Sequence, residues 1–274
     1  MQNKTKQKIE EVEEKNSGSS KSLEKTEITS DIKEELEKEE ESIEAVPKEE
    51  ILKEAVEKKE ELASWIPKTR LGKEVIAGKY KSIDEIFESG EIILEPQIVD
   101  YLVPDLKQDI IFIGGSPGKG GGIRRTPTRM TARMHKSGRR FKLSALVVIG
   151  NENGIVGIGR ATSNEHRTAI QKALNQAKLN VIKIRKGCGS WECNCSGEHS
   201  IPFRTEGKTG SIRVIFYPAP KGIGIVADDE SKKILRLAGI KDIWVKTFGC
   251  TATRINLAFA VFDALKNIRK TKGI

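Results

Sequence analysis

The strongest constraint on the fold is the way charge divides the chain. Residues 1–61 hold 20 acidic and 12 basic side chains, whereas residues 62–274 hold 19 acidic and 36 basic ones. The first segment has no aromatic residue before Trp65 and consists mostly of Glu, Lys and Ser. It cannot bury enough apolar surface to offset the entropy lost on ordering. The sequence therefore predicts a disordered acidic tail at 1–61, with the compact fold built from the basic residues that follow.

A second asymmetry lies inside the basic part of the chain. No Asp or Glu occurs between Asp109 and Glu152, although this interval is rich in Lys, Arg and Gly. Soluble proteins normally mix both signs of charge on their surfaces, and an acid-free arm suits a polyphosphate backbone. A flexible basic loop without a dedicated ligand is the alternative. The nine predicted phosphate-binding cations are Lys119, Arg124, Arg125, Arg129, Arg133, Lys136, Arg139, Arg140 and Lys142.

The hydrophobic pattern after the arm predicts a small α+β unit. Residues 150–154 form a turn before a second strand at 155–159, and Thr162 with Glu165 predicts a capping box at a helix start. Strand, turn, strand and helix beside a basic arm are typical of a double-stranded-RNA-binding-type domain. The apolar positions are Phe141, Leu143, Ala145, Val147 and Ile149 on one face of the first strand, and Ile170, Ala173, Leu174 and Ala177 on the helix.

A second α+β unit begins near Ile201. Residues 212–217 alternate as a strand, Asp228 or Asp229 caps a short helix, and residues 242–247 form another strand, which together predict a βαβ unit. A final helix carries Leu257, Val261, Ala264, Leu265 and Ile268 on one face. We divide the chain into the tail (1–61), an N-terminal adaptor segment (62–106), an RNA-binding domain with the Gly-rich arm (107–180) and a C-terminal α+β domain with a Cys-rich loop (181–274).

Two glycine-rich segments approach nucleotide-binding patterns. Residues 114–120 lack the first Gly of a phosphate loop and the Ser or Thr expected after Lys119. Residues 222–227 match a dinucleotide fingerprint, but too few residues follow for a doubly wound sheet, so we expect tight backbone packing there. The body is poor in acids, and His135 and His166 have no evident nucleophile partner. We expect no enzyme; a nicotinamide-dependent enzyme is the remote alternative.

Three of the four cysteines are crowded into one short segment. Cys188, Cys193, Cys195 and His199 supply three thiols and an imidazole at short spacing, and these are ligand types of tetrahedral zinc. The spacing differs from the paired knuckles of common zinc modules, so a reduced Cys-rich loop without metal is the alternative. Cys250 is predicted to be a buried thiol. So few cysteines do not form a disulfide scaffold.

Hydropathy predicts no contact with a membrane. No apolar run approaches the roughly 18 residues that span a bilayer, and the N-terminus has no apolar signal core. We therefore expect a cytoplasmic protein.

Several motifs, in order along the chain, resemble the small-subunit ribosomal protein S-five family. In the first unit they are His135-Lys-Ser-Gly-Arg-Arg-Phe141 and the run from Ala145 to Gly159. Trp65 to Gly72 and Glu95 to Asp100 are similar to the archaeal and eukaryotic branch, and the archaeal side is favoured. The second unit contributes Gly210 to Val214, Pro218 to Gly224 and Leu237 to Asp242, so the resemblance spans about Trp65 to Ile268.

The resemblance implies a structural protein of the small ribosomal subunit. It would bind small-subunit rRNA near the decoding region, support assembly, translation and decoding accuracy, and use Arg139, Arg140 and Lys142 as RNA contacts. Its partners would be mRNA at the entry channel and the S-three, S-four, S-eight and S-two proteins. The acidic tail and the Cys cluster lie outside what the resemblance implies. From the residues alone, a free regulatory double-stranded-RNA-binding factor remains the alternative.

Overall fold

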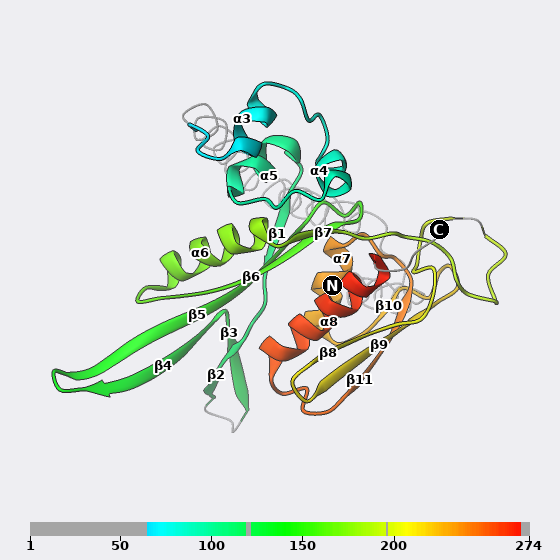
Figure 1. Ribbon diagram of the computed structural model, residues 1–274. Coiled ribbons are helices and arrows are strands. Elements are labelled where there is room, and N and C mark those ends of the chain that lie inside the picture. The colour runs from blue at the N-terminus through cyan, green and yellow to red at the C-terminus, as the bar shows by residue number, and fades with distance from the viewer. Residues whose placement is uncertain (1–64, 119–121, 196, 270–274) are drawn as a thin grey trace, which may run out of the picture. The chain divides into compact units, whose positions relative to one another are not determined.

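The computed structural model describes residues 65–118, 122–195 and 197–269 (Figure 1). The predicted disordered tail and the predicted contact Lys119 lie outside these residues. In the described part, no helix is long and apolar enough to cross a membrane. Two hydrophobic cores organise the fold, and the same central strand contributes to both of them.

Three short helices precede the first sheet. They are α3 (Arg70–Ile76), α4 (Ile83–Ser89) and α5 (Pro96–Leu102). The Glu95 carboxylate holds the start of this segment, because it accepts hydrogen bonds from the Thr69 and Lys68 backbone N–H groups at 2.7 and 2.9 Å and from Trp65 Nε1 at 3.0 Å. Apolar side chains of all three helices join one core with the long helix of the first sheet.

The first sheet has the order β1–β5–β6–β7, and β4 pairs with the outer part of β5. Its strands are β1 (Lys107–Ile110), β4 (Thr128–His135), β5 (Gly138–Gly150), β6 (Ile155–Ser163) and β7 (Val181–Lys183). β5 is long enough to have two partners on one edge: residues 147–150 pair with β1 and residues 138–145 with β4. The β4–β5 hairpin therefore extends beyond the body of the sheet (Figure 1).

Helix α6 (His166–Leu179) packs closely against β6. A Cβ atom added at Gly159 would lie 2.2 Å from the Ala173 carbonyl oxygen, so only glycine allows this approach. The predicted strands and helix are confirmed, but the predicted capping box is wrong. Thr162 pairs with Ser144 inside β6, and the N-cap residue Glu165 makes no capping bond with its side chain.

The second sheet has the order β10–β11–β9–β8 and carries two helices. Its elements are β8 (Thr205–Thr209), β9 (Ile212–Pro218), β10 (Ile225–Val226), α7 (Asp229–Leu237), β11 (Ile243–Phe248) and α8 (Arg254–Arg269). A βαβ unit is present, because β10 and β11 flank α7 and pair in parallel. Its first strand is β10 and not the predicted strand at 212–217, which is β9 and pairs antiparallel with β11. Asp228 caps α7 by accepting a hydrogen bond from the Ser231 N–H, as predicted.

The inner half of β5, residues 143–150, is buried on both faces. Ala145, Val147 and Ile149 face the core shared with α6, while Leu146 and Val148 belong to the core shared with α7 and α8. The alternating pattern had predicted a single buried face. The second face is buried because the second sheet and its helices pack against it, and the backbone contacts are close: the Glu152 N–H donates to the Leu237 carbonyl oxygen at 3.0 Å.

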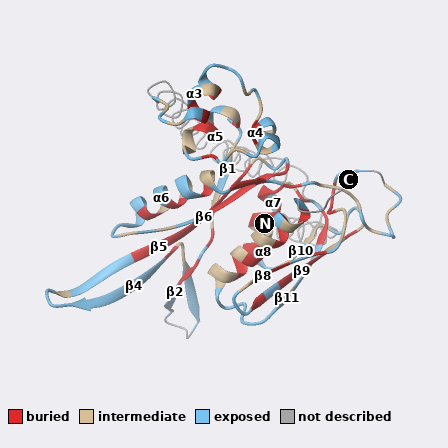
Figure 2. Ribbon diagram, in the orientation of Figure 1, coloured by how far each residue is buried: buried red, intermediate tan, exposed pale blue. Residues whose placement is uncertain are grey.

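The outer half of β5, residues 138–142, has the opposite environment. Figure 2 shows it and nearly all of β4 as exposed. Phe141 continues the same alternation as Leu143 but is 43% exposed, because it lies beyond the end of α6 and has no helix to pack against. The predicted core position at Phe141 is therefore wrong.

Candidate nucleic-acid interface and metal centre

The β4–β5 hairpin has one strongly basic face. Residues directly opposite in an antiparallel pair lie on the same face, and Arg133 lies opposite Arg140, Thr131 opposite Lys142 and Arg129 opposite Ser144. Like charges in direct opposition destabilise a strand pair unless an anion lies between them. Negative charge from outside the chain would therefore stabilise this face.

The other face of the hairpin is apolar and exposed. Met130 and Met134 are 62% and 77% exposed, and the Arg139 guanidinium lies over the Phe141 ring, 5.0 Å from its centroid. Methionine and a guanidinium stacked on an aromatic ring make a surface that adapts to flat or irregular partners. The hairpin thus offers phosphate-type contacts on one side and stacking or apolar contacts on the other.

The remaining predicted cations flank the hairpin. Arg124 and Arg125 lie exposed on β3 (Ile123–Thr126), which pairs with β2 (Gly114–Pro117), and Lys136 lies in the hairpin turn. Residues 114–117 thus form a strand and not a phosphate-binding loop, as expected from the sequence. All eight predicted cations in the described ranges are exposed, and within those ranges none forms an ion pair with a carboxylate.

An open groove of about 950 Å³ lies at the base of the hairpin. Its lining includes Arg129 from β4, Arg160 from β6 and Arg254 from α8, and none of the described residues that line it is Asp or Glu. The sequence prediction missed Arg160 and Arg254. Arg160 could have been noticed as the charge that follows an uninterrupted apolar strand, but nothing in the sequence places Arg254 beside it.

The predicted metal ligands lie together in the Cys-rich loop. The ligand atoms of Cys188, Cys193, Cys195 and His199 all lie within 4.8 Å of one another. Hydrogen bonds from the Cys195 side chain and the Lys221 backbone lower the pKa of Cys193 to about 6. The cluster can hold a metal ion, because it brings three sulfur atoms and an imidazole nitrogen together at short range.

Two sequence interpretations near this loop are corrected. Cys250 is exposed in the turn between β11 and α8, not buried. Gly222 and Gly224 serve backbone conformation and not tight packing, because they have φ of +98° and +77° and an added Cβ would meet no atom within 4 Å. Their N–H groups donate to the Asp242 carboxylate at 3.0 and 2.8 Å, so these donors are already used and do not face a dinucleotide.

Comparison with known proteins resolves the family. Residues 127–185 match the family model described as ribosomal protein S5, N-terminal domain, and residues 207–274 match ribosomal protein S5, C-terminal domain. A small ribosomal subunit protein uS5 from Nanoarchaeum equitans is 48% identical over 195 residues, which cover 71% of this chain and 84% of the relative. The chain belongs to the ribosomal protein S5 family.

Other archaeal S5 proteins are similar to the same extent. The uS5 protein of Methanocaldococcus jannaschii is 47% identical over 71% of this chain and 83% of its own length. That of Ignicoccus hospitalis is 49% identical over 70% of this chain and 84% of its own length. The two family models and these identities confirm the resemblance of the sequence motifs to this family.

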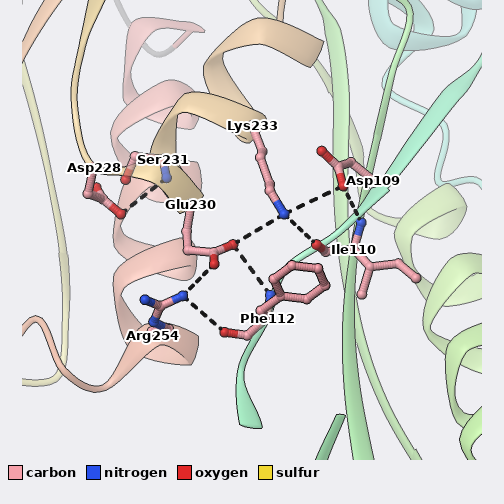
Figure 3. Close-up of polar contacts among 8 residues, drawn as sticks. All are labelled: Asp109, Ile110, Phe112, Asp228, Glu230, Ser231, Lys233 and Arg254. Atoms are coloured by element: carbon pink, nitrogen blue, oxygen red, sulfur yellow. Dashed lines mark hydrogen bonds and ion pairs between the residues drawn. The ribbon is translucent and has the colours of Figure 1, made fainter. Parts of the chain in front are cut away.

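In this S5 protein, a buried ionic network fixes the segment that leads into the basic arm (Figure 3). Glu230 on α7 is 6% exposed, forms an ion pair with Arg254 and accepts a hydrogen bond from the Phe112 N–H at 3.4 Å. Lys233 donates to the Ile110 carbonyl oxygen at 2.9 Å and lies over the Phe112 ring at 4.2 Å. The second S5 domain therefore holds the segment just before β2.

Proposed function

We propose that this protein is a structural constituent of the small ribosomal subunit that binds rRNA through the basic face of the β4–β5 hairpin. Membership of the S5 family supports the ribosomal role. The single observation that supports the binding surface is the pairing of Arg133 with Arg140 on an exposed, acid-free ribbon. Such a ribbon gains stability when phosphate neutralises it.

The proposed contacts extend from this face to the arm and the groove. Lys119, Arg124, Arg125, Arg129, Arg133, Lys136, Arg139, Arg140 and Lys142 bind phosphate, while the two cores keep a fixed shape against folded RNA. Arg160 joins them, because it lines the same acid-free groove as Arg129. These contacts position the protein on the RNA and do not read its sequence.

The finer fold assignment belongs to the same proposal. Strands β4 to β6 and helix α6 have the strand–strand–strand–helix order of a double-stranded-RNA-binding-type domain, with the exposed hairpin as its extension. We propose the division into tail (1–61), adaptor (62–106), RNA-binding domain (107–180) and C-terminal domain (181–274). The adaptor helices support the first sheet, since they share the core that contains Val147 and Ile149.

The position in the subunit follows from the family resemblance. We place the protein near the decoding region at the mRNA entry side in the cytoplasm, beside the S-three, S-four, S-eight and S-two proteins, where it supports assembly and decoding accuracy. The exposed apolar face of the hairpin, with Met130 and Met134, suits contact with a neighbouring protein or an unstacked base. We propose no catalytic role, and the cofactor considered is a metal ion in the Cys-rich loop.

A free regulatory double-stranded-RNA-binding factor is the competing function. It shares the domain type but needs no ribosome, and it would bind any duplex of about 16 base pairs. The 47–49% identity to small-subunit proteins favours the ribosomal role.

Sedimentation separates the two functions. A native lysate is washed at high salt, which removes proteins held only by non-specific phosphate contacts, and is run through a sucrose gradient. We expect the full-length protein to remain with the small subunit. Its appearance in the soluble fractions, together with binding to unrelated duplex RNA, would overturn the ribosomal assignment in favour of the free factor.

A further inference from the structure

We propose that Cys188, Cys193, Cys195 and His199 bind one structural zinc ion that fastens the Cys-rich loop to the second sheet. Zinc bonded to thiolates at about 2.3 Å and to imidazole at about 2.0 Å places tetrahedral ligand atoms about 3.5–3.8 Å apart. The four ligand atoms here lie within 4.8 Å of one another. They therefore need to move by no more than about 1 Å to surround an ion.

The imidazole is oriented as a metal ligand requires. His199 Nδ1 lies 2.9 Å from Asp242 Oδ2, and both side chains are buried. This contact directs Nε2 at the sulfurs, 3.0 Å from Cys195 Sγ and 3.7 Å from Cys193 Sγ. A carboxylate that holds the far nitrogen of a histidine is the usual second contact of zinc-bound histidines, because it fixes the ring and raises the basicity of the ligand.

The loop that carries the thiols is also built for a fixed geometry. Gly187 and Ser200 exchange backbone hydrogen bonds of 2.9 Å, and the Gly189 N–H donates to the Ile201 carbonyl oxygen at 3.1 Å. Cys188 therefore lies between Gly187 and Gly189, whose backbones are both held by hydrogen bonds to residues 200–201. A Cβ at Gly189 would lie 2.1 Å from the Pro202 carbonyl oxygen, so the close return of the chain past Cys188 needs glycine.

Zinc at this position would join three segments that are distant in sequence. The thiols come from the loop at 188–195, and His199 follows just beyond it. Asp242, just before β11, bridges His199 to the Gly222 and Gly224 N–H groups through its other oxygen. One ion would thus order the loop at 218–224 and the start of the parallel β10–β11 pair as well as its own ligands.

The test uses the full-length protein, purified with reductant and without chelator. We expect about one zinc per chain by mass spectrometry of the metal, and, on exchange with Co²⁺, the visible d–d bands of tetrahedral thiolate coordination. Cys193→Ser should lose the metal. Cys250→Ser, which removes an exposed thiol outside the cluster, is the matched control and should keep it. Asp242→Asn should weaken zinc binding by about 10- to 100-fold.

A second measurement keeps the proposal testable if Cys193→Ser does not fold. Removal of zinc from the wild type with a chelator should increase amide hydrogen exchange in residues 187–202 and 218–226 and leave the β4–β5 hairpin unchanged. Three results overturn the proposal: reduced wild-type protein without zinc, a Cys193–Cys195 disulfide seen as a mass 2 Da lower in protein purified from a reducing cytosol, or hydrogen exchange that is insensitive to the chelator. None of these results depends on rRNA binding.

Discussion

The two halves of β5 differ in what their side chains do, although they form one continuous strand. Residues 143–150 are buried on both faces and belong to both hydrophobic cores, whereas residues 138–142 are exposed or nearly so and carry Arg139, Arg140 and Lys142. Residues 138–142 belong to neither hydrophobic core, and they are extended because they continue the strand formed by residues 143–150. Its side chains are therefore free for a partner, because folding does not need them.

The largest effect should come from the inner half. Leu146 is fully buried, so Leu146→Ala removes buried apolar volume and should lower the free energy of unfolding by about 3 kcal/mol. Met134→Ala in the outer ribbon, where the side chain is 77% exposed, should change it by less than about 0.5 kcal/mol. Urea denaturation of both full-length variants measures this difference. Equal losses would mean that the hairpin is part of the folding core.

The outer half should show the reverse pattern. Arg133→Gln with Arg140→Gln removes the opposed pair on the basic face and should lower the slope of log affinity against log salt by about one unit per lost contact or slightly less. The urea midpoint should not fall. Titration of rRNA at several salt concentrations measures the slope.

The control for that titration removes the same charge elsewhere. Arg70→Gln with Lys79→Gln neutralises two exposed cations on the adaptor, where both pair with Glu74. The salt slope should stay at the wild-type value. If this pair lowers the slope as much as the hairpin pair does, net charge and not the ribbon determines binding.

The smallest effect concerns the adaptor that supports the inner half. Burial alone would raise the pKa of Glu95, but hydrogen bonds from Thr69, Lys68 and Trp65 together hold it below its ordinary value. Because the pKa of Glu95 is lower in the folded state than in the unfolded state, its ionised carboxylate stabilises the fold at pH values above the unfolded pKa, which is near 4.5. This stabilisation is lost as the pH falls through the folded pKa. Glu95→Gln should therefore be less stable than the wild type at pH 6, and the difference should shrink in acid.

Thermal melts between pH 3 and pH 6 measure that difference, and Glu88→Gln on the exposed side of α4 is the matched control. A constant difference between wild type and Glu95→Gln across this range would show that the carboxylate acts through shape and not through its charge.

Local pattern predicted central strands and helices of both sheets but missed β1 to β4, β8 and β10. Alternation found the β5, β6 and β9 segments, a helical stripe found α6 and α8, and Asp228 was one of two predicted caps of α7. The failures have tertiary causes. Thr162 is a good cap residue by type, but it pairs with Ser144 in β6, and Phe141 fits the core pattern but lies past the end of α6, where nothing covers it.

The site was predicted in part for similar reasons. Charge composition identified the exposed cations, and ligand types identified the Cys-rich loop. Composition could not reveal that Arg133 faces Arg140, that Arg160 joins Arg129 in one groove, or that Asp242 holds His199. Each of these contacts joins residues that are brought together by the register of paired strands or by the packing of distant segments. A short stretch of sequence specifies neither of these.

The sequence by itself determined the acid-free basic arm, several central strands and helices, the four clustered metal-ligand types and the family, because these depend on composition, periodicity and local motifs. Only the tertiary structure decided the second buried face of β5, the two unlike faces of the hairpin and the buried Glu230 network that positions the arm. These features arise when residues far apart in the chain pack together, and a side chain's environment is then set by its neighbours in space.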